Sequence, residues 1–256
     1  MKKRIFLAAI FAATSAACIL PSCEKEEIAG QKPDNQDSQE LIAKSFSSPY
    51  SWVGEVHNYV LGDLIEFEDF TSETFTSQKN LIINYSNQYL DGYGVDDMSS
   101  GVMLEQSVYN RYAVTDFCHF SKLEEDLNNE DVIDFLREIF EKSGSSLVDD
   151  NVRSAYFQSK INSANSNPNF TSSEKEMLEA GIVLMHYSAN FWLHDPEDLD
   201  IDPGVSDDKW WKRVKADAGG FFIGFFTELL DGDDNTENPP LNGGLGMGVI
   251  ASIFTK

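Results

Sequence analysis

Cysteine is scarce in this chain of 256 residues, which contains Cys18, Cys23 and Cys118. No two of them form the CxxC pair that a structural zinc site or a redox motif uses. Cys18 and Cys23 belong to an N-terminal segment that we expect to be processed, so an intramolecular disulfide is excluded from the mature chain. Cys118 lies between aromatic residues in "DFCHF", which favours a buried, unreactive thiol over a nucleophile.

Basic residues are also few. The chain has 19 Lys and Arg against 43 Asp and Glu, and its formal net charge is −24 at pH 7. The segment that we expect to be removed takes basic residues and no acidic ones, so the mature protein is more acidic still. We therefore expect no nucleic-acid partner, because phosphate binding needs positive charge. An anionic membrane surface would likewise repel the body of the protein.

The common catalytic and cofactor motifs are missing. The sequence has no HExxH, no P-loop, no GxSxG elbow and no GxGxxG after a strand, so we expect no cofactor. The histidines follow no metal-binding pattern, and each is expected to be a core or boundary residue: His57, His119, His186 and His194. A hydrolase with an unrecognised site stays open as an alternative, because the absence of a known motif is weak evidence against one. A deep cleft that unites a histidine with carboxylates would favour it.

One acidic stretch is a candidate calcium site. In "DLDIDPG", Asp198, Asp200 and Asp202 alternate as the first ligands of an EF-hand loop do. Pro203 then stands where the sharp-turn glycine is needed, and Lys209 stands where a bidentate Glu is needed. Our main expectation for residues 196–208 is a solvated acidic loop, with calcium binding as the alternative.

The first 22 residues have the pattern of a secretory signal peptide. Lys2, Lys3 and Arg4 form a basic start, and an apolar run extends from Ile5 to Leu20. The run is too short and wrongly flanked for a membrane span, which makes an N-terminal anchor helix the less favoured alternative.

The segment "LPSC", Leu20 to Cys23, resembles the lipobox of bacterial lipoproteins, where the peptide is cut before a cysteine that becomes diacylated and N-acylated. Ser22 fits the small residue of that pattern, whereas Pro21 departs from it. Cys18 is a rival in "SAAC", but it lies within the apolar run, so we assign the lipid to Cys23. The acidic "EKEE" that follows resembles the surface-export signal of Bacteroidota lipoproteins. These resemblances imply a lipoprotein of the outer membrane that is exposed at the cell surface and held by several acyl chains.

Behind the cysteine, residues 23–40 are polar and predict a flexible tether. Residues 41–195 predict an all-α domain, because their periodicity is helical and no run combines strict alternation with hairpin turns. The clearest helix follows an expected N-cap at Asn129. Its apolar stripe consists of Val132, Leu136, Ile139 and Phe140. Another helix begins with a capping box from Thr171 to Glu174. Weaker helical patterns lie near 77–90, 101–125 and 150–163.

Residues 209–256 carry two apolar segments rich in glycine, "ADAGGFFIGFF" and "GGLGMGVIASIF". Small residues recur at every fourth position, at Ala216, Gly220 and Gly224 in the first segment and at Gly244, Gly248 and Ser252 in the second. Such spacing puts the small residues on one helical face and lets two helix backbones approach closely. The pattern predicts a glycine-zipper-like helical hairpin. Each segment has about 12 residues, fewer than the roughly 20 that a span needs.

Two interpretations of this hairpin remain open. It either packs against itself and docks on the helical domain, or it is a membrane-active or partner-binding element that waits in a folded state. The two segments resemble the glycine-patterned ends of class II bacteriocin-like peptides, which implies the second interpretation. Aromatic residues in "SPYSW", "FWLHDP" and "KWW" suit either a core or an exposed interface.

We expect a non-enzymatic lipoprotein that serves as an interaction or structural module at the cell envelope. Its partners would be the membrane, through the N-terminal lipid, and an unidentified protein or envelope ligand. A membrane-active or antagonistic protein that acts through the C-terminal hairpin is the first alternative. The hydrolase is the second alternative.

Overall fold

The computed structural model describes residues 46–67, 70, 73–98, 124, 127, 129–194, 208–231 and 239–254. These residues form helices and connecting turns without a β-strand, so the all-α prediction is confirmed for this part of the chain. The α-helices are α2 (Ser51–Glu66), α3 (Phe75–Leu90), α6 (Glu130–Phe140), α7 (Asp150–Ser166), α8 (Ser172–His194), α9 (Asp208–Asp231) and α10 (Pro239–Phe254). Two 3-10 helices are η2 (Asp91–Tyr93) and η3 (Gly144–Leu147).

Several predicted segments lie outside the described residues. They are the signal peptide, the tether, the acidic loop up to residue 207 and the helical pattern predicted near 101–125, of which Glu124 alone is described. The stretch 232–238, which joins α9 to α10, also lies outside them.

Polar side chains cap the starts of α6 and α8. Asn129 Oδ1 accepts a hydrogen bond from the backbone N–H of Asp131 at 3.0 Å, which confirms the predicted N-cap. Thr171 Oγ1 accepts from the Glu174 N–H at 3.2 Å, and the Glu174 carboxylate accepts from the Thr171 N–H at 2.7 Å, which confirms the capping box. Asn129 Nδ2 also donates to Glu174 at 2.8 Å, so one bond joins the two helix starts. The predicted stripe of α6 is buried: Val132, Leu136, Ile139 and Phe140.

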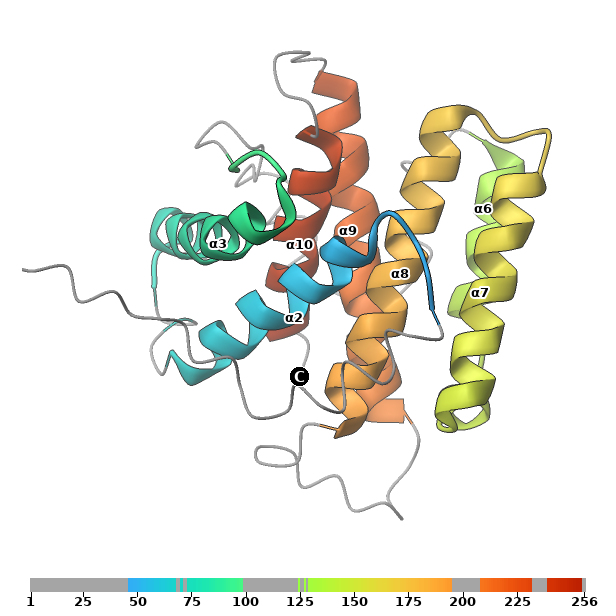
Figure 1. Ribbon diagram of the computed structural model, residues 1–256, viewed down its shortest axis with the longest axis horizontal. Coiled ribbons are helices and arrows are strands. Elements are labelled where there is room, and N and C mark those ends of the chain that lie inside the picture. Colours follow the sequence, from blue (N-terminus) through green and yellow to red (C-terminus); the bar gives the residue numbers. More distant parts are fainter. Residues whose placement is uncertain are drawn as a thin grey trace, which may run out of the picture.

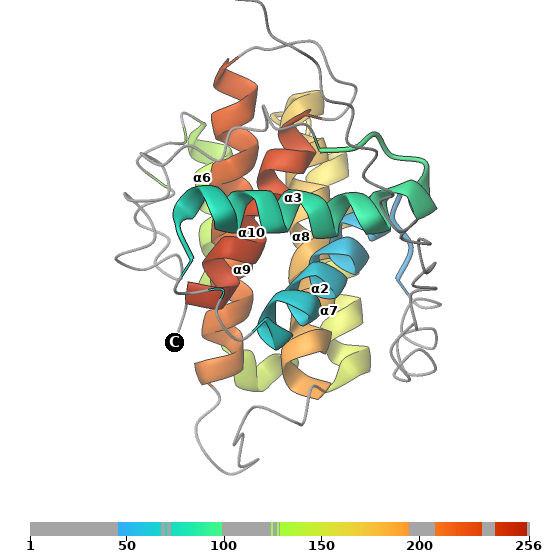
Figure 2. The same ribbon diagram turned by 90° about the vertical axis from the view of Figure 1, so that its left-hand side faces the viewer.

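The helix α8 lies near the middle of the bundle. It contacts α2, α7 and α9, whereas α10 packs along α9 and also contacts α2 and α3. In Figure 1, α6 and α7 stand on one side of α8, and α2 and α3 lie on the other. Figure 2 shows α3 crossing α10 on the outside of the bundle. The two C-terminal helices are therefore part of the body, and other helices cover them.

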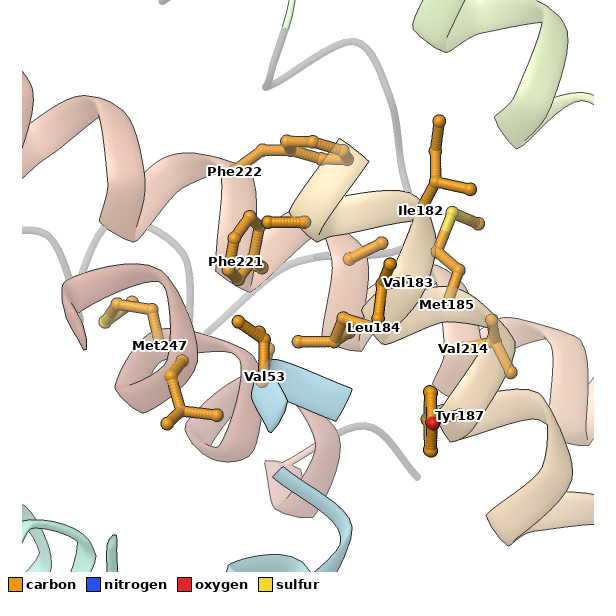
Figure 3. Close-up of a cluster of buried hydrophobic side chains, with 14 of the residues drawn as sticks. Val53, Ile182, Val183, Leu184, Met185, Tyr187, Val214, Phe221, Phe222 and Met247 are labelled. Carbon is orange, nitrogen blue, oxygen red and sulfur yellow. The ribbon is translucent and has the colours of Figure 1, made fainter. Parts of the chain in front are cut away.

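Three helices are buried on all sides over long stretches. Every residue is buried from 177 to 190 in α8, from 216 to 225 in α9 and from 241 to 251 in α10. A helix that is apolar all round is stable only when other elements surround it. Figure 3 shows Val53 of α2, Leu184 of α8, Phe221 of α9 and Met247 of α10 in one cluster. The core of the protein is thus built around its C-terminal helices.

The backbones of α9 and α10 meet at glycines. A Cβ atom on Gly220 would lie 2.3 Å from the carbonyl oxygen of Met247, and one on Gly224 would lie 2.2 Å from that of Gly243. Such positions are sterically forbidden to any side chain, so glycine is needed at both. The predicted small residues Ala216, Gly220, Gly224, Gly244 and Gly248 are all buried. Ser252 lies in α10, and its side chain is outside the described residues.

We expect Gly220→Ala to destabilise the protein, because the added methyl group would overlap the Met247 carbonyl oxygen and force α9 away from α10. Overpacking of this kind costs about 1–3 kcal/mol. Gly62→Ala in α2 is the matched control, since no atom lies within 4 Å of its Cβ position. Replacing a helical glycine by alanine there should gain about 1 kcal/mol. Urea denaturation followed by circular dichroism measures both variants, and equal effects would contradict the close approach of the two helices.

Candidate functional site

A carboxylate lies in the middle of the apolar body. Asp217 of α9 is 0% exposed. Its Oδ2 accepts a hydrogen bond from the indole Nε1 of Trp192 at 3.1 Å and another from the hydroxyl of Ser188, both on α8. The imidazole Nε2 of His57, on α2, lies 3.8 Å from the same oxygen. Three helices therefore converge on one carboxylate oxygen.

Sequence reasoning missed Asp217, although the sequence carries a signal for it. This residue is the acidic one within "ADAGGFFIGFF", and a charge in an apolar helical run needs a partner if the helix is buried. The donors of its hydrogen bonds, Ser188 and Trp192, lie 29 and 25 residues away in the chain. Periodicity does not connect residues so far apart.

His57 is fully buried, and the other nitrogen of its ring, Nδ1, contacts a side-chain amide. Its Nδ1 lies 3.1 Å from Oδ1 of Asn58. Asn58 Nδ2 in turn donates to the backbone carbonyl of Tyr187 at 2.9 Å. A chain of polar contacts thus runs from α8 through α2 to α9, and Asn58 positions the imidazole.

A second buried polar group joins α7 to α8. The guanidinium of Arg153 is 0% exposed and donates to the carbonyl oxygens of Leu147 and Val148 at 2.9 and 3.0 Å. It also donates to Asn190 Oδ1 at 3.1 Å and forms an ion pair with Asp150. Burial tends to raise the pKa of Asp150, but the hydrogen bond and charge of Arg153 outweigh it and lower the pKa.

His186 lies beside this Arg153 group. Its ring stacks on Phe46 with centroids 4.3 Å apart, and its Nε2 lies 3.4 Å from Asn190 Nδ2. Burial lowers the pKa of His186 to about 3, and the positive charge of Arg153 acts in the same direction. His186 is therefore neutral near pH 7, and its contacts are those of a core residue.

These groups do not form a site for nucleophilic catalysis. In a serine hydrolase the histidine lies between the serine and the carboxylate, whereas Ser188 here donates directly to Asp217. Ser188, Asp217 and His57 are each 0% exposed, so a substrate does not reach them. Within the described ranges, no group of His, Cys, Asp and Glu side chains is arranged to hold a metal ion.

The remaining candidates lie at the surface or outside the described residues. His194, at the end of α8, has a side chain that is 54% exposed and lies 3.3 Å from Asp150. The predicted lipid and calcium positions lie outside the described residues, and so do one further cysteine and one histidine. These residues are Cys23, Cys118, His119, Asp198, Asp200 and Asp202. Three tryptophans that suited either core or interface are buried: Trp192, Trp210 and Trp211.

We expect His186 to make the protein sensitive to acid. An unfolded histidine takes up a proton near its ordinary pKa of about 6.5, whereas the pKa of folded His186 is about 3. Between these values the unfolded state binds one proton more, so the free energy of unfolding falls by about 1.4 kcal/mol for each unit of falling pH. His186→Phe keeps a ring against Phe46 and should remove this portion of the loss. Urea denaturation across this pH range compares the two proteins, and parallel profiles would contradict the assignment.

The chain matches no family model, no curated protein and no solved structure.

Proposed function

We propose that this protein is a non-enzymatic, lipid-anchored component of the cell envelope, and that its helical body serves as an interaction or structural module. The observation that carries the proposal is that three side chains capable of acid–base or ionic chemistry are buried between helices. Asp217, His57 and Arg153 are each 0% exposed, and each contacts a neighbouring helix. Side chains used in this way hold helices together and do not meet a substrate.

The N-terminal sequence supports the lipid anchor. A basic start, an apolar run and Cys23 in "LPSC" occur in the order that lipoprotein export requires. Several acyl chains bind a membrane stably, whereas one chain alone binds marginally. The polar residues 24–40 would hold the body away from the bilayer, which suits a chain of net charge −24 because anionic lipid repels it.

The composition also narrows the class of partner. The chain has 43 acidic residues against 19 basic ones, so its surface field attracts positively charged groups and repels negatively charged ones. A protein or envelope ligand of neutral or positive charge fits this field, and nucleic acid does not.

Cys23→Ser should move the full-length protein from the membrane fraction to the soluble fraction of a bacterial host, because the variant lacks the sulfur that carries the diacylglyceryl group with its two acyl chains. Cys18→Ser is the matched control, since it makes the same change within the apolar run. It should leave the protein in the membrane fraction. Cell fractionation and labelling with a tagged fatty acid measure both variants. Loss of the fatty-acid label only in Cys18→Ser would place the lipid on Cys18. If neither variant takes up the label and both stay in the membrane fraction, the lipid anchor is contradicted.

A second candidate function is membrane activity through α9 and α10, and one observation favours it. These helices are buried on all sides over 216–225 and 241–251, and the helices that cover them are α2, α3 and α8. If the pair left the body, it would expose a continuous apolar surface that prefers lipid to water. Among the described helices, none has both the length and the apolar character needed to cross a bilayer.

If this second candidate holds, a variant with a loosened α9–α10 contact should release dye from lipid vesicles faster than a variant with an intact contact. Gly220→Ala and Gly62→Ala, each prepared as residues 24–256, form the matched pair. Vesicles of neutral lipid avoid charge repulsion by the acidic body. If Gly220→Ala is destabilised and both variants release dye only at the background rate, the second candidate is wrong. The two helices then serve only as part of the core.

A further inference from the structure

The contacts of Asn58 determine where one proton of His57 lies. The backbone oxygen of Tyr187 only accepts hydrogen bonds, so the Asn58 atom that faces it at 2.9 Å is the amide nitrogen. Oδ1 of Asn58 therefore faces Nδ1 of His57, at 3.1 Å. Because this oxygen also only accepts, Nδ1 carries a hydrogen. A neutral imidazole with its hydrogen on Nδ1 has a bare lone pair on Nε2.

That lone pair would face a carboxylate. Nε2 of His57 lies 3.8 Å from Oδ2 of Asp217, and it makes no hydrogen bond to any described residue. Oδ2 already accepts hydrogen bonds from Trp192 and Ser188, and two donors favour the ionised oxygen. Two electron-rich atoms that face each other in a dry interior repel, since little water screens them. A hydrogen on Nε2 converts the contact into an attractive ion pair.

We propose that His57 and Asp217 form a proton latch, a buried pair that holds one additional proton on Nε2 of His57 whenever α9 is docked on α2 and α8. The proposal concerns the docking of the C-terminal helices, and it does not depend on which of the two candidate functions holds.

The surroundings of the proton latch come from four helices. On α2, Asn58 is a neutral partner of the imidazole. From α8, the neutral Ser188 and Trp192 donate to the carboxylate. From α10, Gly248 covers the pair, because its Cβ position lies 3.6 Å from Cδ2 of His57 and 3.1 Å from the Asp217 carbonyl oxygen. On α9, Asp217 faces the imidazole, and Arg213, one helical turn before it, lies with its guanidinium carbon 4.2 Å from the centroid of the Trp192 ring that donates to the same carboxylate. Because both side chains are fully buried, the pair exchanges its proton with solvent when the helices separate.

The proton latch makes folding depend on pH with a definite sign. In the unfolded chain a histidine is neutral above about pH 6.5, whereas the latched histidine keeps its proton, so the folded state binds one proton more. The folding equilibrium constant then falls as the pH rises, by about tenfold per unit for as long as the proton is retained. His186 has the opposite effect, because its burial weakens the fold as the pH falls.

Nitrogen-15 NMR of the folded protein, labelled at histidine, tests the proton latch directly. At a pH well above 6.5, the signals of His57 should show hydrogens on both ring nitrogens, and the exposed His194 provides an internal comparison. A His57 spectrum with a hydrogen on Nδ1 alone would overturn the proposal.

Asp217→Asn provides a second, independent test. The neutral amide oxygen of the new residue can still accept from Trp192 and Ser188, but it puts no full negative charge opposite Nε2, so the additional proton on His57 loses its counter-charge. Relative to this variant, the folding equilibrium constant of the wild type should fall about tenfold per pH unit above pH 6.5. A constant ratio between the two proteins would refute the proton latch. If Asp217→Asn does not fold, the NMR spectrum of the wild type decides by itself.

Discussion

The close contact between α9 and α10 is the constraint on which the rest of the structure depends. Carbonyl oxygens of Met247 and Gly243 occupy the space where side chains of residues 220 and 224 would lie. Because the two backbones touch, the large side chains of α9 are directed toward the other helices. The ring of Phe222 lies so near α8 that a Cβ on Gly181 would be 2.4 Å from it. Glycine on one helix thus creates the room that phenylalanine on another fills, and the body closes around this pair.

The apolar attraction that holds the other helix surfaces together has little directional preference of its own. The two buried polar groups supply the direction. Asp217 meets Ser188 and Trp192 in one register of α9 on α8, and Arg153 meets Asn190 in one register of α7 on α8. A register shift would leave a charge buried without these bonds, which costs more than the bonds gain. These residues therefore act on the specificity of packing, which is the role that the proposed interaction module requires of its body.

Much of the local structure could be predicted from the sequence, because it rests on contacts within a few residues. The cap at Asn129, the capping box from Thr171 to Glu174 and the stripe of α6 are of this kind. The polar groups could not be predicted, since their partners are far apart in the chain. Arg153 and Asn190 are separated by 37 residues, and Asp217 and Ser188 by 29. The histidines show the same limit, because His57 faces Asp217 and His186 stacks on Phe46, and both partners are far away in the chain.

The sequence by itself determined that the described part of this protein is helical, where its capped helices begin, and which faces carry small residues. Those properties follow from the 3.6-residue period of a helix and from bonds between near neighbours. Only the tertiary structure decided that α9 and α10 lie inside the bundle, that the tryptophans of α8 and α9 belong to the core, and that a carboxylate shares the interior with a histidine. These outcomes depend on which helix surfaces cover one another, and that is a property of the whole packed chain that no single segment contains.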